Sequence, residues 1–152
     1  MKYDDMSWHT GAAEYPKELP KEAAATHTGM FIAWALLSGL GGELAAEELP
    51  SLQARSITPG RFFYDQCDGK FVDEDLNAEG NAFAAAYFDL DKGAYLKDYD
   101  RVLCAGVTTA YEVADTWENF DKLKPRLDRR LDEWRRGVLG RTPWWQFWKY
   151  GR

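Results

Sequence analysis

The sequence predicts a mostly α-helical protein, with a single compact domain over residues 1–141 and at most a minor short-strand element. Three observations predict this fold class. A segment near residues 20–38 is rich in helix formers and then apolar, helix-start signals follow further along, and an apolar stripe with helical spacing lies near the end of the domain. The chain has 152 residues, 45% of them hydrophobic and 29% charged, which is typical of one globular domain with a sizeable core.

The first strong element is a helix over about residues 20–38. Pro20 suits the first helical turn, and the Lys-Glu-Ala-Ala-Ala run after it consists largely of good helix formers. Residues 29–37 are apolar on nearly every face, so we expect this helix to be central and buried. The segment before it, residues 1–18, contains turn-forming glycine and proline and is expected to be irregular.

Shorter helices are expected in the middle of the chain. A proline follows a threonine at Thr58-Pro59, which is a helix-start signature, and Pro50 should interrupt the helix before it. Three consecutive acidic residues precede another helix, where they favour the positive end of its dipole. Residues 106–109 are expected to form a loop or a short strand. The predicted helices cover residues 43–55, 59–69, 75–88 and 94–104.

The last predicted helix has both a start signal and an internal break. Asp115 followed three residues later by Glu118 resembles a capping box, with Asp115 in the cap position. Pro125 should kink or restart this helix, because proline lacks the backbone N–H that a helix interior uses. An apolar stripe with spacings of 4, 3 and 4 residues predicts the face that packs on the core: Leu127, Leu131, Trp134 and Val138.

The net charge of −6 is unevenly distributed along the chain. Residues 1–121 carry 9 basic and 22 acidic side chains, a net charge of −13, whereas residues 122–152 carry 10 basic and 3 acidic side chains, a net charge of +7. Such an acidic body repels phosphates, so we expect no nucleic-acid partner. It suits a basic protein partner instead.

The sequence contains no nucleotide-binding glycine motif, P-loop or Gly-x-Ser-x-Gly element, so we expect a protein that binds a partner rather than an enzyme, and no cofactor. The partner is expected to be a basic protein domain that meets the two acidic segments in the middle of the chain. The predicted partner-binding side chains of these segments are Asp65, Asp68, Asp73, Glu74, Asp75 and Glu79.

The chain's only two histidines and a pair of adjacent aspartates define a second candidate site: Asp4, Asp5, His9 and His27. Imidazole and carboxylate groups are suitable metal ligands, and histidine titrates near neutral pH. One interpretation is therefore a small metal-binding or acid–base enzyme. The other is a core histidine that is hydrogen-bonded to a carboxylate, because buried polar groups need partners. No metal-binding motif such as His-x-x-x-His is present, and we assign no metal from the sequence.

Residues 142–152 form an aromatic and basic C-terminal tail in which Trp144, Trp145 and Trp148 are further candidates for partner contact. Tryptophan and tyrosine beside lysine and arginine suit a partner's groove or a membrane interface. A tail that folds back onto the domain explains the same composition. If the tail binds a partner, the protein is an adaptor that docks through it.

The expected location is the cytoplasm. Two cysteines, Cys67 and Cys104, do not make a disulfide framework, and the N-terminus lacks the apolar core of a signal peptide. The longest apolar stretch, Gly29 to Leu40, has 12 residues and is too short to span a bilayer.

Several longer motifs resemble a family of small bacterial proteins of unknown function, and the resemblance extends to about residue 136. The motifs are Tyr3-Asp4-Asp5-x-Ser7-Trp8-His9, Ala25-Thr26-His27-x-Gly29-Met30-Phe31-x-Ala33-Trp34-Ala35, Cys67-Asp68-Gly69-Lys70-Phe71 and Asp115-Thr116-Trp117-Glu118-Asn119-Phe120-Asp121. Families of this size and acidity often act as immunity proteins. The resemblance thus implies a non-catalytic cytoplasmic immunity protein that neutralises a cognate bacterial toxin by occluding it.

Overall fold

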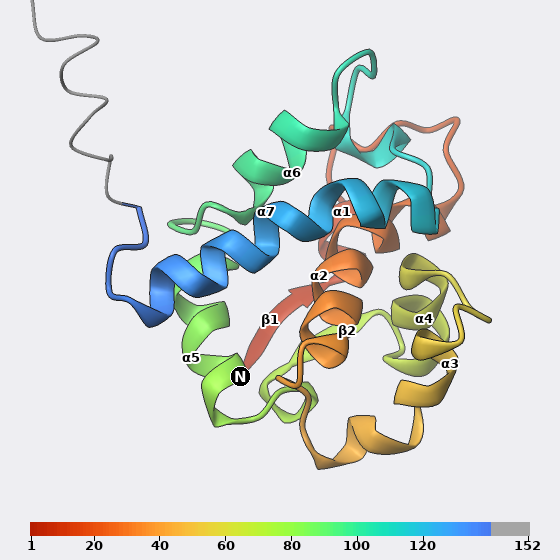
Figure 1. Cartoon of the computed structure of the whole chain (residues 1–152). Coiled ribbons are helices and arrows are strands. Elements are labelled where there is room, and N and C mark those ends of the chain that lie inside the picture. The colour runs from red at the N-terminus through yellow and green to blue at the C-terminus, as the bar shows by residue number, and fades with distance from the viewer. Residues whose placement is uncertain (141–152) are drawn as a thin grey trace, which may run out of the picture.

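The computed structural model describes residues 1–140, which form seven α-helices, four 3₁₀ helices and one two-stranded sheet (Figure 1). The mostly helical fold predicted from the sequence is confirmed. In chain order the elements are β1 (Lys2–Asp5), α1 (Met6–Thr10), η1 (Lys21–Ala25), α2 (Thr26–Leu37), η2 (Glu43–Glu47), α3 (Leu49–Gln53), α4 (Pro59–Gln66), β2 (Lys70–Val72), η3 (Asp73–Asp75), α5 (Ala78–Tyr87), α6 (Tyr95–Leu103), η4 (Ala110–Glu112) and α7 (Trp117–Arg135).

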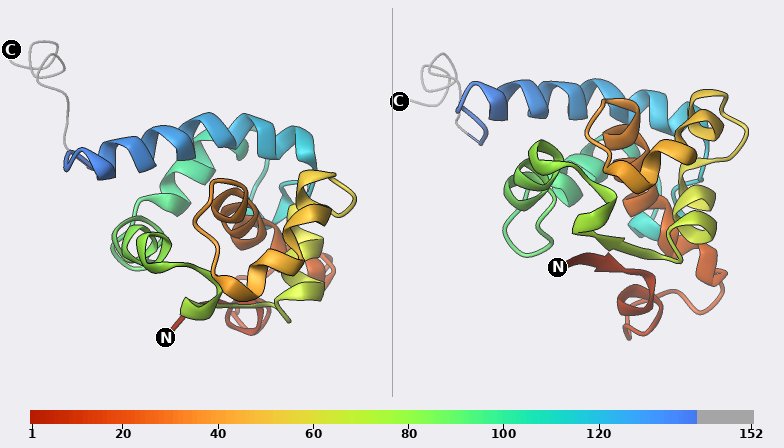
Figure 2. Two further views of the ribbon diagram at one scale, coloured as in Figure 1. Left: turned by 60° about the horizontal axis from the view of Figure 1, so that its bottom comes forward. Right: turned by 90° about the horizontal axis from the view of Figure 1, so that it is seen from below.

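Helix α2 is central, as its apolar sequence predicts. Every residue from Thr26 to Leu36 is buried, and the chain enters α2 directly from the 3₁₀ helix η1. Figure 2 shows α2 between α7 on one side of the molecule and the two strands on the other. A helix with no polar face gains its stability by being covered on all sides, since each exposed apolar side chain would lose its transfer free energy.

Helices α2 and α4 cross closely at Gly29. A Cβ atom at this position would lie 2.4 Å from the carbonyl oxygen of Pro59 and 2.7 Å from the Cα atom of Gly60. Both neighbours are backbone atoms that cannot move aside. Glycine is therefore required here for close approach of two backbones, and this approach brings the start of α4 against the start of α2.

The strand pair corrects the expectation that residues 1–18 are irregular throughout, and residues 106–109 form a loop, one of the two predicted alternatives. The N-terminal residues form β1 and α1, and β1 runs antiparallel to β2, with Asp4 opposite Phe71. Pairing between segments so distant in the chain leaves no local pattern in a four-residue strand. As a consequence, β1 and α1 lie beside the first turn of α2.

The predicted interruption near Pro50 is confirmed, since the break between η2 and α3 falls at Glu48 and Pro50 lies in the first turn of α3, where proline is tolerated. The start of the next helix differs from the prediction. The acidic run Asp73–Asp75 forms the separate 3₁₀ helix η3 instead of opening α5. Helix α5 starts after Asn77, whose side-chain oxygen accepts a hydrogen bond from the Gly80 amide at 2.8 Å.

The predicted cap of the last helix is wrong by one residue. Thr116 caps α7, accepting a hydrogen bond from the Asn119 amide at 3.1 Å. The carboxylate of Asp115 instead caps α4, accepting hydrogen bonds from the Gly60 amide at 2.8 Å and from the Thr58 hydroxyl at 2.6 Å. The Asp115 side chain serves a distant helix because the fold places the free amides of α4 within its reach.

Helix α7 runs from Trp117 to Arg135 through Pro125 without the restart that was one of the two predicted effects of this proline. Its stripe packs as expected where the helix lasts, since Leu127 and Leu131 are buried. Val138 lies beyond the last helical residue. The apolar contacts along this stripe outweigh the one backbone hydrogen bond that proline removes.

Replacing Pro125 with alanine should therefore stabilise the protein by about 2 kcal/mol. Pro125 is exposed, so no packing is lost, and alanine restores the backbone N–H that can donate to the Asp121 carbonyl. Urea denaturation followed by circular dichroism measures the change. As a control, Lys124→Ala alters the neighbouring exposed position without restoring an N–H and should have an effect well under 1 kcal/mol. A Pro125→Ala variant no more stable than the parent would show that α7 is adapted to its proline.

None of the helices in the described part of the chain combines the length and the apolarity that crossing a membrane requires.

Candidate functional site

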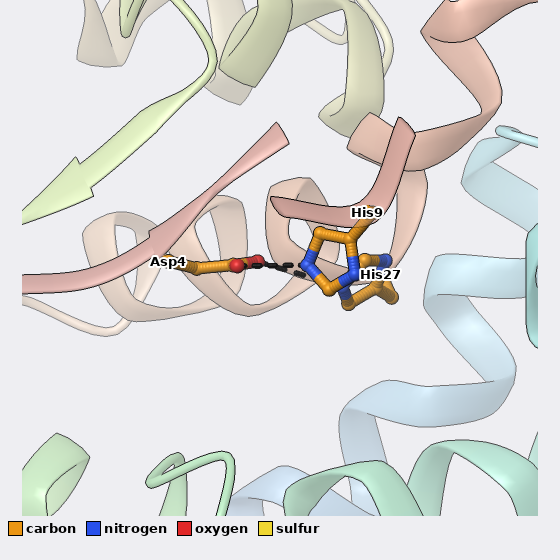
Figure 3. Close-up of side chains that lie close together, drawn as sticks. All are labelled: Asp4, His9 and His27. Atoms are coloured by element: carbon orange, nitrogen blue, oxygen red, sulfur yellow. Dashed lines mark hydrogen bonds and ion pairs between the residues drawn. The ribbon is translucent and has the colours of Figure 1, made fainter. Parts of the chain in front are cut away.

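The carboxylate of Asp4, on β1, is completely buried and is the centre of a polar cluster (Figure 3). One of its oxygens accepts hydrogen bonds from Nε2 of His9 at 2.7 Å and from the Asp5 amide at 2.8 Å. The other oxygen accepts a hydrogen bond from the Thr28 hydroxyl and lies 3.5 Å from Nε2 of His27. Two imidazoles from different helices therefore point at one buried carboxylate.

Both histidines make further contacts besides those with Asp4. His9, on α1, has its Nδ1 2.9 Å from the hydroxyl of Tyr111, which is on η4. The ring of His9 meets the ring of His27 edge to face, with centroids 4.6 Å apart. The backbone carbonyl of His27 accepts a hydrogen bond from the Tyr95 hydroxyl on α6. The cluster thus joins β1, α1, α2 and η4.

Burial and hydrogen bonding set the charges in this cluster. Burial alone would raise the pKa of the Asp4 carboxyl, but the hydrogen bonds to His27 and His9 together outweigh it and hold the pKa well below its usual range. Burial lowers the pKa of the His27 imidazole by more than the nearby carboxylate raises it. The two shifts favour the charged form of the Asp4 carboxyl and the uncharged form of the His27 imidazole.

Three of the four residues of the predicted polar site come together, and the Asp5 side chain does not join them. The Asp5 carboxylate caps α1, accepting hydrogen bonds from the amide and the hydroxyl of Ser7 at 2.9 and 2.7 Å, and it pairs with Lys2 at 2.7 Å. Sequence reasoning missed Thr28 and Tyr111. Thr28 directly follows His27 in a noted motif, whereas no pattern around Tyr111 indicates its role.

A second feature is an acidic patch, defined as Glu43, Glu47, Glu48, Glu74 and Asp75. It forms where η2 meets η3, and the Gly42 amide donates a hydrogen bond to the Asp75 carbonyl at 3.0 Å across this junction. In residues 1–140, none of the five carboxylates lies within ion-pair distance of a basic nitrogen. Leu44 projects from the same turn with 73% of its surface exposed.

A hollow of about 200 Å³ opens in the acidic patch beside Leu44. Its lining includes the apolar side chains of Ile32 and Phe62, with the carboxylates of Glu48 and Asp75 also in its wall. Burial raises the pKa of both carboxyl groups, and their acidic neighbours raise it further. These like charges repel one another and are stabilised by an incoming cation.

The predicted partner-binding acids divide into two groups. Four of them already have a cationic partner: Asp65 pairs with Arg61 at 2.7 Å, Asp68 with Lys70 at 3.1 Å, Asp73 with the N-terminal amine at 3.1 Å and Glu79 with Arg135 at 2.6 Å. The other two, Glu74 and Asp75, belong to the acidic patch. The prediction omitted the patch carboxylates of residues 43–48, although the three glutamates of this short segment could have indicated them. Trp144, Trp145 and Trp148 lie outside the described residues.

The fold and these two features define a small helical domain with a buried aspartate–histidine cluster and an acidic patch on its surface. The chain belongs to the family described as Domain of unknown function (DUF7832), which matches residues 2–113. This match confirms the expected family of unknown function and ends before the motif that starts at Asp115. No curated protein and no solved structure matches the chain.

Proposed function

We propose that this protein is a non-catalytic binding protein of the cytoplasm, and specifically an immunity protein that neutralises a cognate bacterial toxin by covering it. The observation that supports this proposal best is the acidic patch, whose five carboxylates have no cationic partner in the described part of the chain. Like charges gathered without compensation cost stability, and a basic partner removes that cost on binding.

The acidic patch combines charged groups with apolar ones, as protein-binding surfaces do. Exposed Leu44 supplies an apolar anchor. The adjacent hollow has an apolar wall that can contact the aliphatic stem of a lysine or an arginine, and carboxylates that can pair with its charged head. The surrounding charge would accelerate encounter with a basic toxin domain. The partner class that fits is therefore a basic protein surface with a protruding cationic side chain.

The test reverses two exposed charges of the patch, Glu47→Lys together with Glu74→Lys. The association rate constant with a basic partner captured from the native bacterium should fall by at least about tenfold at low salt, and its salt dependence should become shallower. The matched control, Glu18→Lys with Asp91→Lys, makes the same net charge change at exposed acids away from the patch. Equal effects of the two double variants would refute the patch as the binding surface.

A separate experiment tests the hypothesis that the partner is a toxin. Affinity capture from the native bacterium, with the adjacent gene co-expressed, should yield a stoichiometric basic partner that is toxic alone and harmless with this protein. A protein that is captured alone argues against the proposal. Deleting residues 142–152 separates the adaptor alternative, because capture through the tail would be lost while capture through the acidic patch would persist.

Acid–base catalysis is the alternative raised by the hydrogen-bond chain from Asp4 through His9 to Tyr111. The Asp4 carboxylate and His27 are buried, and the hollow of about 420 Å³ beside the N-terminal segment is lined by Asp5 of the predicted site but by neither histidine. A substrate in that hollow would not contact the imidazoles. The geometry therefore favours binding over catalysis, because a general base must reach the proton that it removes.

A further inference from the structure

The aspartate–histidine cluster has the donor atoms and the convergence of a metal site. One ligand atom each from Asp4, His9 and His27 can be chosen so that all three lie within 4.8 Å of one another. Tetrahedral Zn²⁺ with bonds of about 2.0–2.1 Å places its ligand atoms about 3.3 Å apart, so small side-chain movements suffice. We propose that Asp4, His9 and His27 form a binding site for one divalent transition-metal ion such as Zn²⁺. This inference does not depend on the proposed function.

Charge compensation distinguishes this carboxylate from the other deeply buried one. Asp98 on α6 is met by two guanidinium groups, with Arg126 Nη1 at 2.9 Å and Arg130 Nε at 2.7 Å. The ion-pair partners of Asp4 among the described residues are the two histidines alone, and these bear a charge only when protonated. A buried anion is further stabilised by a cation nearby, and a metal ion bound by both imidazoles would supply one.

In metal sites, the ligating side chains are oriented by hydrogen bonds to surrounding groups, and the three proposed ligands are surrounded by groups of this kind. The Thr28 hydroxyl and the Asp5 amide hold the Asp4 carboxylate, and the Tyr111 hydroxyl lies 2.9 Å from Nδ1 of His9. Metal binding at Nε2 moves the His9 proton to Nδ1, from which it is donated to Tyr111. A phenol oxygen accepts as readily as it donates, so the same contact serves both states.

The metal would link the N-terminal segment to the core. β1 and α1 are held against the molecule by a two-stranded sheet, and such a sheet is marginally stable by itself. A metal ion coordinated by residues of β1, α1 and α2 joins this segment to the most deeply buried helix. Metal binding should therefore stabilise the fold as a whole, because a ligand that binds only the folded state shifts the unfolding equilibrium.

The test is a titration of the full chain, after treatment with a chelator, with Zn²⁺ by calorimetry and with Co²⁺ by visible absorption. We expect one equivalent to bind, tetrahedral Co²⁺ bands to appear, and the Tm to rise by about 5–10 °C at metal concentrations about 100-fold above Kd. These measurements on the unaltered protein need no variant. If neither Zn²⁺ nor Co²⁺ binds at the cluster, it is a plain hydrogen-bond network and the proposal fails.

Three variants test where the ion is bound. His9→Gln removes one ligand and should weaken binding at least about 100-fold, and Tyr111→Phe, which removes only an orienting group, should weaken it about 10–100-fold. Asp91→Asn is the matched control, since Asp91 is exposed and lies outside the cluster, and binding should be unchanged. Metal binding that persists undiminished in folded His9→Gln would place the ion elsewhere and overturn the proposal.

Discussion

Replacing Trp34 with alanine should lower the free energy of unfolding by about 3–5 kcal/mol. The indole of Trp34 is completely buried in α2, and its centroid lies 5.7 Å from each of the rings of Phe31 and Phe83. Its N–H donates a hydrogen bond to the Asp128 carboxylate at 2.9 Å. The truncation therefore removes a large apolar area, leaves a cavity at the centre of the helical packing and breaks a link between α2 and α7.

Chemical denaturation followed by far-ultraviolet circular dichroism measures this loss without relying on tryptophan emission. Trp8→Ala is the matched control, because Trp8 is 51% exposed on α1 and its removal should cost less than about 1 kcal/mol. Similar losses for the two variants would contradict the central position of α2.

Replacing Asp98 with asparagine should lower the free energy of unfolding at neutral pH by about 3 kcal/mol. The carboxylate is 1% exposed, and it accepts hydrogen bonds from Tyr87 at 2.7 Å, Arg126 at 2.9 Å and Arg130 at 2.7 Å. Asparagine keeps the shape but removes the counter-charge of Arg126 and leaves Arg130 paired with Glu133 alone. The loss is at the lower end of the range for buried ion pairs, because both arginines keep some contact with solvent.

The effect of this substitution should depend on pH. Burial would raise the pKa of the Asp98 carboxyl, but its bonds to Arg130, Tyr87 and Arg126 outweigh burial and lower the pKa below its ordinary value of 3.8. A carboxyl whose pKa is lower in the folded state stabilises the fold above the unfolded pKa and loses that contribution as the pH falls through the folded value. The difference between parent and Asp98→Asn should therefore shrink below about pH 4.

Denaturation midpoints measured from pH 7 to pH 2 would follow this change. Asp100→Asn, at an exposed position on the same helix, should show a small and nearly constant difference from the parent over the same range. If the gap for Asp98→Asn stayed constant down to pH 2, the carboxylate would not be the source of the stabilisation.

The helices that the sequence predicted well are those whose signals are local. The central helix and the helix near residues 94–104 follow from runs of helix formers and apolar side chains, and the observed α2 and α6 lie within them. The sequence prediction was wrong where contacts with residues distant in the chain determine the local structure. Asp115 caps α4 rather than its own helix, and α7 continues through Pro125 because the core covers its apolar stripe.

The candidate sites, too, could be predicted from the sequence only in part. The grouping of Asp4, His9 and His27 was predicted as a possible site, but their convergence depends on the pairing of β1 with β2. Whether an acidic side chain is free or already paired depends on the basic groups that the fold brings to it. Glu79 meets Arg135, whereas Glu74 has no such neighbour among residues 1–140.

Four properties follow from the sequence alone: the protein is mostly helical, α2 is buried, the body of the chain is acidic, and the chain belongs to a family of unknown function. These properties depend on composition and on patterns within a few helical turns. The three-dimensional packing, in contrast, determines which carboxylates lie together on the surface and which carboxylate contacts the two histidines. Those contacts join residues far apart in the chain, and their geometry is set by packing and strand pairing rather than by any local pattern.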